Sequence, residues 1–401
     1  MSIKQLYVYL NHKFIYNYDR KYPSIKEQMQ FMQKLPDPKD DIEASYNKYL
    51  AQLFYYYSIL IRIIFNAGGL LVWPILWRKY RKAYRLFGCE DVKNDRIEGR
   101  KGVIVVKGSR VSPADIMPPD LETKYGTVDY VSLDENCILD DEAEEIFKSC
   151  VKRYWLHPYF LVMNLRRLGE TGALVKRFTP RAIATYARER DFSMSIITQY
   201  CEGKGIDHIG FMHGDDYLTV DKINTRYTKY YVWDQHYVDM YCKLKCPRKQ
   251  FVVYLPKKLK GITKPRSSGI YDFYITYYFS AESKKTIHGV LKAFEVFRTS
   301  GLKCKIRPHP RFSDIPYLKK VFDKYTVEDP AKVPLADSIE NSEYIASLNS
   351  TVLSQAYYSS KKIAIDDFSD PKRYQAMIDR KYIMMQKPHA LISVLVAEHT
   401  K

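Results

Sequence analysis

Short apolar runs alternate with amphipathic stretches along most of the chain after residue 101. Runs such as GVIVV (102–106), IDHIGFM (206–212) and YDFYITYYF (271–279) are rich in β-branched and aromatic residues, which favour strands. The stretches 140–155 and 283–301 are patterned as helices, and the second stops at a glycine. This repeated order of strand and helix predicts an α/β protein with parallel sheets covered by helices.

The other expected elements follow the same order. We expect strands at 128–133, 229–233, 251–255, 303–308, 343–347 and, as the last strand, 361–366. Further helices are expected within 180–190, 236–243, 315–325 and 350–360.

A stretch at 256–270 that is rich in Lys, Gly, Pro and Ser has the composition of an interdomain linker. A chain of 401 residues is also more typical of two domains than of a single domain with one hydrophobic core. We therefore expect a helical extension over 1–100 and two Rossmann-like domains, 101–258 for the acceptor and 270–401 for the nucleotide donor. Ligands of such domains bind at the carboxyl ends of the strands.

The extension holds the most apolar stretch of the chain, residues 53–77. Arg62, Asn66 and Pro74 interrupt it, so a membrane-spanning helix is not expected. RKYRKAYR follows at 78–85, with five cations in eight positions. The segment 53–85 suits either an anchor lying in the plane of an anionic membrane or a buried helix with a solvated basic end.

The chain carries 64 Lys and Arg against 46 Asp and Glu, a net charge of +18. Such an excess favours a polyanionic partner, which includes nucleic acid, an anionic membrane and a phosphorylated substrate. Seven scattered cysteines fit a reducing compartment, and no secretory pattern opens the sequence, so a cytoplasmic protein is expected. The 36 tyrosines suit base stacking, but no familiar RNA- or DNA-binding motif accompanies them.

The strand at 303–308 ends in a turn with groups suited to a phosphate. Arg307, His309 and Arg311 lie in IRPHPR, where Pro310 restricts the backbone. A guanidinium group can donate two hydrogen bonds to two oxygens of one phosphate, and an imidazole adds a further donor. The same residues would also make a rigid surface turn.

A second candidate for phosphate binding is SLNST, at a strand-to-helix junction. Asn349, Ser350 and Thr351 lie where N–H groups and hydroxyls bind anions, although helix capping alone would explain them. Glu282 follows the strand 271–279 and could touch a ribose or an acceptor, or simply begin a helix. Together these loops could hold a nucleotide phosphate from two sides.

In the first half, MHGDDY (212–217) follows a strand. His213, Asp215 and Asp216 are candidates for a general base acting on an acceptor hydroxyl, and Gly214 permits a tight turn. An exposed turn with two solvated aspartates is the alternative.

A strand ending in HG, a later strand ending in HP and a Ser-rich strand-to-helix turn resemble the bacterial surface-polysaccharide glycosyltransferases. The resemblance covers about Ala182 to Asp366. It includes sialyl- and polysialyltransferases, capsule Kdo transferases and, more distantly, CDP-glycerol glycerophosphotransferases. It implies a GT-B fold, with two Rossmann-like domains around a cleft, and catalysis without a metal or other cofactor.

The resemblance also implies roles for single residues. His309 with Pro310, and Ser350 with Thr351, would bind the donor phosphate. His213 corresponds to the HG histidine of the glycerophosphotransferases, whereas the sialyltransferases use a carboxylate, for which the pair 215 and 216 are the candidates. Here the glycine precedes the acidic pair instead of following it, so the base is left open.

The expected function is a metal-independent glycosyltransferase that moves a sugar from a CMP- or CDP-activated donor to a capsule, lipopolysaccharide or O-antigen type acceptor. Direct displacement, with inversion, is the expected mechanism, at the inner face of the cytoplasmic membrane and without a nucleic-acid partner. The alternatives are transfer of a polyol phosphate from a CDP-glycerol-type donor, an inert scaffold of the same fold, and a basic nucleic-acid-binding protein.

Overall fold

The computed structural model describes residues 22–56, 59–90, 102–106, 115–126, 128–131, 137–186, 188–260, 271–280, 282–310 and 312–400. They divide into two compact units. The N-terminal unit takes the chain before residue 114 with 117–213 and 219–254, and the C-terminal unit takes 255–401 with two short segments, 114–116 and 214–218.

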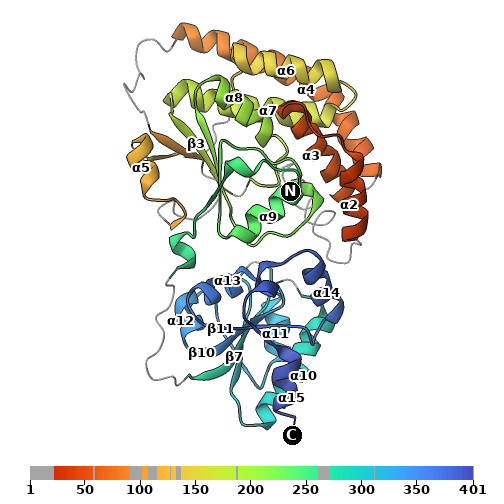
Figure 1. Ribbon diagram of the computed structural model, residues 1–401, viewed down its shortest axis with the longest axis vertical. Coiled ribbons are helices and arrows are strands. Elements are labelled where there is room, and N and C mark those ends of the chain that lie inside the picture. Colours follow the sequence, from red (N-terminus) through yellow and green to blue (C-terminus); the bar gives the residue numbers. More distant parts are fainter. Residues whose placement is uncertain are drawn as a thin grey trace. The chain divides into compact units, whose positions relative to one another are not determined.

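The N-terminal unit contains a parallel sheet of six strands (Figure 1). In chain order these are β1 (Val103–Val106), β2 (Val128–Val131), β3 (Ala182–Tyr186), β4 (Asp207–Phe211), β5 (Lys229–Val232) and β6 (Phe251–Val253). Their order in the sheet is β2-β1-β3-β4-β5-β6, and every pair is parallel. The order reverses between β1 and β3, the place where ligands of such sheets bind.

Five helices accompany the strands of this unit in the described part of the chain. They are α5 (Asp120–Tyr125), α6 (Asp141–Tyr154), α7 (Pro158–Phe178), α8 (Met194–Gly203) and α9 (Gln235–Lys243).

The helix expected within 180–190 is wrong, because β3 occupies 182–186. All five of its residues are buried, and the strand pairs with β1 on one side and β4 on the other. The alanines and the charged residues after them have good helix propensity, but a position in the middle of a sheet overrides that preference. The helices on either side, α7 and α8, were not expected.

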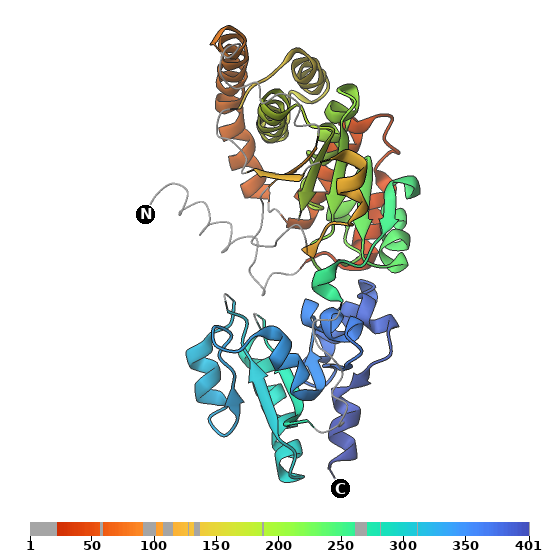
Figure 2. The same cartoon turned by 90° about the vertical axis from the view of Figure 1, so that its left-hand side faces the viewer.

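Three helices form the N-terminal extension: α2 (Ile25–Lys34), α3 (Asp41–Tyr56) and α4 (Ile59–Glu90). α2 begins with a capping box, in which Ser24 and Glu27 bond each other's backbone N–H. α4 packs along α7, and at Gly69 the two backbones come so close that an added Cβ would lie 2.7 Å from the carbonyl carbon of Pro158. Figure 2 shows α4 as one long helix on the outside of its unit.

The C-terminal unit has a second six-stranded parallel sheet. Its strands are β7 (Phe273–Tyr278), β8 (Cys304–Arg307), β9 (Thr326–Val327), β10 (Ser342–Ser347), β11 (Lys362–Ile365) and β12 (Ala390–Leu391), in the sheet order β12-β11-β10-β7-β8-β9. Numbered within the unit this is 6-5-4-1-2-3, the Rossmann order, which reverses between β7 and β10. β12 lies beyond the strand at 361–366 that was expected to be the last.

The helices of this unit are α10 (Lys284–Thr299), α11 (Ile315–Val321), α12 (Leu335–Glu340), α13 (Thr351–Tyr358), α14 (Pro371–Asp379) and α15 (Ile392–Glu398). Apolar side chains of α10, such as Phe294 and Phe297, pack with Ile275 and Ile306 of the sheet to form one core.

The expected fold class is confirmed: the protein is α/β, with two Rossmann-like parallel sheets and a helical N-terminal region. Residues 261–270 of the expected linker lie outside the described residues.

Candidate functional site

Four loops follow the strands around the reversal in the C-terminal sheet: 279–283 after β7, 308–314 after β8, 348–350 after β10 and 366–370 after β11. Because these strands are parallel, the loops lie at one edge of the sheet. His309 and Ser350 are therefore at the same edge, on loops of two strands that both flank β7.

Hydrogen bonds tie the loops after β7 and β8 together. The backbone N–H of His309 donates to Ser313 Oγ at 2.8 Å, and that hydroxyl donates to the carbonyl oxygen of Ser280 at 2.8 Å. The N–H of Ser280 in turn donates to Glu282 Oε2 at 2.5 Å. The imidazole of His309 stacks on Phe312 with ring centroids 4.5 Å apart, so its orientation is defined.

Glu282 has an unusual carboxyl group for a loop residue. Its second oxygen, Oε1, is buried and has no hydrogen-bond partner in the described part of the chain. Burial raises the pKa of Glu282 to about 7, although the charge of Arg373 acts in the opposite direction. A buried acceptor without a partner costs free energy, so a donor from a ligand would be stabilising here.

Arg373 connects this carboxyl group with the loop after β10. It lies in α14 and donates to Asn349 Oδ1 at 3.0 Å, while Asn349 Nδ2 donates to the hydroxyl of Tyr217 at 3.3 Å. The reversal between β7 and β10 thus carries a carboxyl group, an amide and a guanidinium group.

Ser350 caps the first turn of α13. Its Oγ accepts from the N–H of Val352 at 3.3 Å, and Thr351 is the first residue of the helix. Ser350 is thus a helix cap, which was the alternative considered from the sequence. A capping serine can still donate the proton of its hydroxyl to a ligand.

Arg307 lies inside the C-terminal unit. Its guanidinium donates to Glu328 Oε2 at 2.7 Å and to the carbonyl oxygen of Val333 at 2.9 Å, and Lys305 binds the other oxygen of Glu328 at 2.8 Å. The side chain is buried, so a role toward the donor stays a prediction without support from these contacts. Arg311 lies outside the described residues, and Pro310 is exposed.

The loop 212–217 is divided between the two units. His213 belongs to the N-terminal unit, whereas Asp215 and Asp216 pack into the C-terminal unit. The hydroxyl of Ser354 in α13 lies 2.7 and 2.8 Å from the two carboxylate oxygens of Asp215, and Asp216 is 3% exposed. Asp216 is thus buried and Asp215 half-buried, and their role as a base stays a prediction.

His213 faces a buried carboxylate. Its Nδ1 lies 3.5 Å from Glu189 Oε1, its side chain is 56% exposed, and that of Glu189 is 7% exposed. Burial alone would raise the pKa of Glu189, but contacts with His213, a backbone N–H and the charge of Arg190 together outweigh it, so the pKa is lowered. An exposed imidazole oriented by a buried carboxylate is the arrangement of a general base.

The loop that carries Glu189 is fixed from the N-terminal extension. Lys48 of α3 is fully buried and donates to the carbonyl oxygen of Glu189 at 2.6 Å and to Thr225 Oγ1 at 2.8 Å. Burial lowers the pKa of Lys48 to about 8. Tyr186 also holds the next loop, because its hydroxyl donates to the carbonyl oxygen of His213 at 3.3 Å.

Glu189, Arg373 and Lys48 were not predicted from the sequence. A signal for Glu189 exists, since the charged segment RERD (188–191) directly follows a strand, but that strand was interpreted as a helix. Arg373 and Lys48 sit in helices far along the chain from their partners, where no local pattern marks them.

Comparison with solved structures finds several distant similarities. The UDP-GlcNAc 2-epimerase of Methanocaldococcus jannaschii is 10% identical with a TM-score of 0.43, over 75% of this chain and 92% of that one. The wall teichoic acid polymerase TagF is 10% identical with a TM-score of 0.43, over 86% and 89%. A glycosyltransferase from Rickettsia africae is 11% identical with a TM-score of 0.40, over 68% and 80%.

No protein-family model and no curated protein matches this sequence.

Within the described ranges, no helix combines the length and the apolarity needed to cross a membrane.

Proposed function

We propose that the protein is a transferase that uses a nucleotide-activated donor and binds the nucleotide at the carboxyl edge of the C-terminal sheet. The observation that carries this proposal is the polar cluster at the reversal between β7 and β10, where a buried oxygen of Glu282 has no hydrogen-bond partner among the residues that the structure describes. The finer assignment, a CMP- or CDP-activated sugar and a bacterial surface-glycan acceptor, rests on the sequence motifs.

His213 is the base in this proposal. It takes the proton of an acceptor hydroxyl, whose oxygen attacks the anomeric carbon of the donor, and the bond from that carbon to the nucleotide phosphate breaks. The electron pair leaves on the phosphate oxygen. His309 and the start of α13 stabilise that charge, a role for preorganised donors that contributes about 3 to 4 kcal/mol per group in other enzymes. Glu189 is a positioning residue, because it acts through the imidazole.

A thermal-shift panel with CMP, CDP, UDP and GDP tests the proposal. We expect one cytidine nucleotide to raise the melting temperature, since a ligand at 100 times its Kd adds about 2.7 kcal/mol. Glu282→Gln should reduce the shift, and Asp379→Asn, at the end of α14, is the control that should retain it. No shift with any of the four would contradict the proposal.

Transfer of a polyol phosphate is distinguished by its products. Sugar transfer leaves every phosphate of the donor on the nucleotide, whereas a CDP-glycerol-type reaction releases CMP and moves one phosphate to the acceptor.

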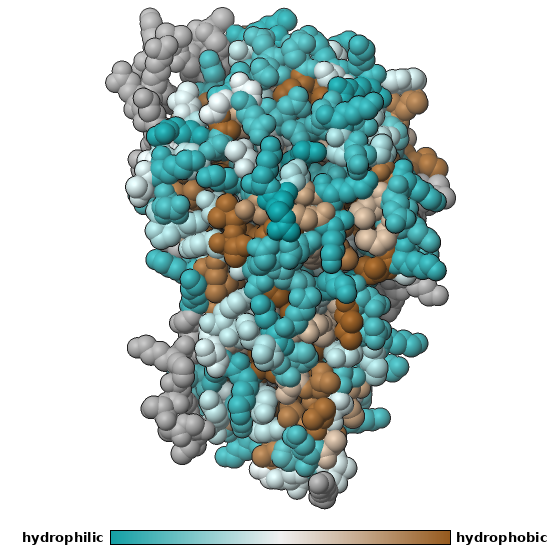
Figure 3. All heavy atoms as spheres, in the orientation of Figure 1, coloured by the Kyte–Doolittle hydropathy of each residue, from teal (hydrophilic) through white to brown (hydrophobic). Residues whose placement is uncertain are grey.

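The proposal includes attachment to an anionic membrane through α4. Seven large apolar residues in the described part of this helix are more than two-fifths exposed: Ile63, Ile64, Leu70, Leu71, Val72, Ile75 and Leu86. Trp155 and Leu156, 60% and 66% exposed, precede Pro158, which touches α4 at Gly69. In Figure 3 hydrophobic residues show at the upper right edge, where α4 runs in Figure 1.

The basic end of α4 supports an anionic surface as the partner. Arg81 pairs with Asp141 at 3.0 Å and with Glu144 at 2.8 Å, so it has a role within its unit. The other four cations of 78–85 are Arg78, Lys79, Lys82 and Arg85, and all are exposed.

We expect the protein to sediment with vesicles of phosphatidylcholine and phosphatidylglycerol. Replacing the four exposed cations by Gln should weaken binding at least tenfold, because each contributes about 1 kcal/mol near such a surface. Leu71→Ser with Ile75→Ser should also weaken it, and Val394→Ser, an exposed apolar residue of the other unit, should not. Equal sedimentation of all variants would contradict attachment through α4.

A further inference from the structure

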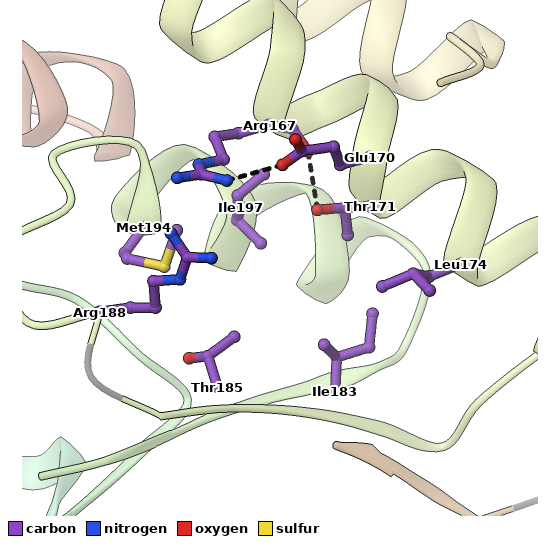
Figure 4. A pocket seen from close by; sticks show the side chains of 9 residues that line it. All are labelled: Arg167, Glu170, Thr171, Leu174, Ile183, Thr185, Arg188, Met194 and Ile197. Atoms are coloured by element: carbon purple, nitrogen blue, oxygen red, sulfur yellow. Dashed lines mark hydrogen bonds and ion pairs between the residues drawn. The ribbon is translucent and has the colours of Figure 1, made fainter. Parts of the chain in front are cut away.

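A small, open pocket of about 30 Å³ lies in the N-terminal unit between β3, α7 and α8. Four apolar side chains line it: Leu174, Ile183, Met194 and Ile197 (Figure 4). The loop directly after β3 supplies Arg188, so the pocket reaches the carboxyl end of a strand beside the reversal of its sheet. This is where ligands of α/β sheets bind.

The other charged groups around the pocket already satisfy one another. Arg167 donates to Glu170 Oε2 at 2.7 Å and to Asp191 Oδ2 at 2.8 Å. Arg166 donates to the second oxygen of Glu170, also at 2.7 Å. Both carboxylates are therefore neutralised by arginines other than Arg188.

Arg188 makes only a longer contact with these carboxylates in the described part of the chain. Among all described residues its guanidinium has one charged neighbour, Asp191 Oδ2 at 3.7 Å, which is beyond hydrogen-bonding distance. That oxygen already accepts from Arg167. The side chain is 25% exposed, and Figure 4 shows the guanidinium directed into the pocket toward α7. Burial, followed by the positive charge of Arg167, lowers the pKa of Arg188.

This arrangement leaves one positive charge to be satisfied. Three arginines (166, 167 and 188) share the two carboxylates of Glu170 and Asp191, and a guanidinium that is partly removed from water with few acceptors is destabilising. The planar fork of an arginine matches a carboxylate, which accepts two parallel hydrogen bonds. A single negative charge balances the excess, whereas a phosphate dianion would exceed it beside two carboxylates.

We propose that this pocket binds the carboxylate of a small organic acid through Arg188, with the apolar part of the acid against the four aliphatic and thioether side chains. The site is separate from the donor site of the C-terminal unit and does not depend on the proposed function.

The experiment is a thermal-shift titration of the full chain with formate, acetate and propionate at constant ionic strength, without nucleotide. The amides of the same acids and inorganic phosphate are the comparison arms. We expect a saturable rise in melting temperature with the acids, larger for the more apolar ones, and none with the amides or with phosphate. A rise with phosphate, or equal rises with acids and amides, would overturn the assignment.

Two variants locate the effect. Arg188→Met removes the charge at similar length and should abolish the shift while leaving the ligand-free protein about as stable, because a half-buried cation with no hydrogen bond to a carboxylate is lost. Arg181→Met, an exposed position directly before β3, should keep the wild-type shift. A ligand-free Arg188→Met that melts well below wild type would show a structural role instead, and an unchanged shift in it would place the acids elsewhere.

Discussion

His213→Ala is expected to reduce transfer by at least about a hundredfold, the usual contribution of a positioned general base. The imidazole lies on the surface of its unit, so the melting temperature should stay close to that of wild type. Turnover measured as nucleotide release in the presence of acceptor checks this, with His236→Ala as the control. Wild-type turnover in His213→Ala would sink the assignment, and a comparable loss in Asp216→Asn alone would move the role to the carboxylate.

Substitution of Glu189, the partner of the His213 imidazole, should affect kcat and KM differently. Glu189→Gln keeps the size of the side chain and removes its charge, so we expect kcat to fall by about tenfold or more with KM little changed, because the residue orients the base and does not hold substrate. Glu189→Asp should restore part of the rate. Equal rates in both variants would show that the carboxylate does not act through the histidine.

His309→Ala has the second large expected effect, again a loss of about a hundredfold, since it removes a donor to the leaving phosphate. The backbone of the turn is held by Ser313 and should survive, because that bond comes from the N–H of residue 309 and not from the ring. His288→Ala, an exposed position on α10, is the matched control. If His309→Ala transfers at the wild-type rate, the phosphate contact lies elsewhere.

The carboxyl edge of the C-terminal sheet was the most predictable part of the candidate site. The turn after β8 and the cap of α13 are local features, because prolines and a capping serine act within a few residues of themselves. They lie at one edge because β8, β7 and β10 are parallel neighbours. The alternation of strands and helices in the sequence already predicted a parallel sheet.

What escaped prediction depends on contacts between distant segments. Arg307 pairs with Glu328, which follows α11 in the chain. An arginine at the end of a strand, expected to be available for a phosphate, is therefore buried in an ion pair. The loop 212–217 offers no local reason why Asp215 should bind Ser354, which lies 139 residues further along the chain. Mistaking β3 for a helix hid Glu189, since the loop after an expected helix gives no reason to look for a residue that orients a base.

The central claim is that a nucleotide occupies the carboxyl edge of the C-terminal sheet, and hydrogen–deuterium exchange with and without the stabilising nucleotide tests it most directly. We predict slower exchange in the loops 279–283, 308–313 and 348–352, with little change at the opposite ends of the same strands. Slower exchange confined to the N-terminal unit, or none in these three loops at saturating nucleotide, would contradict it.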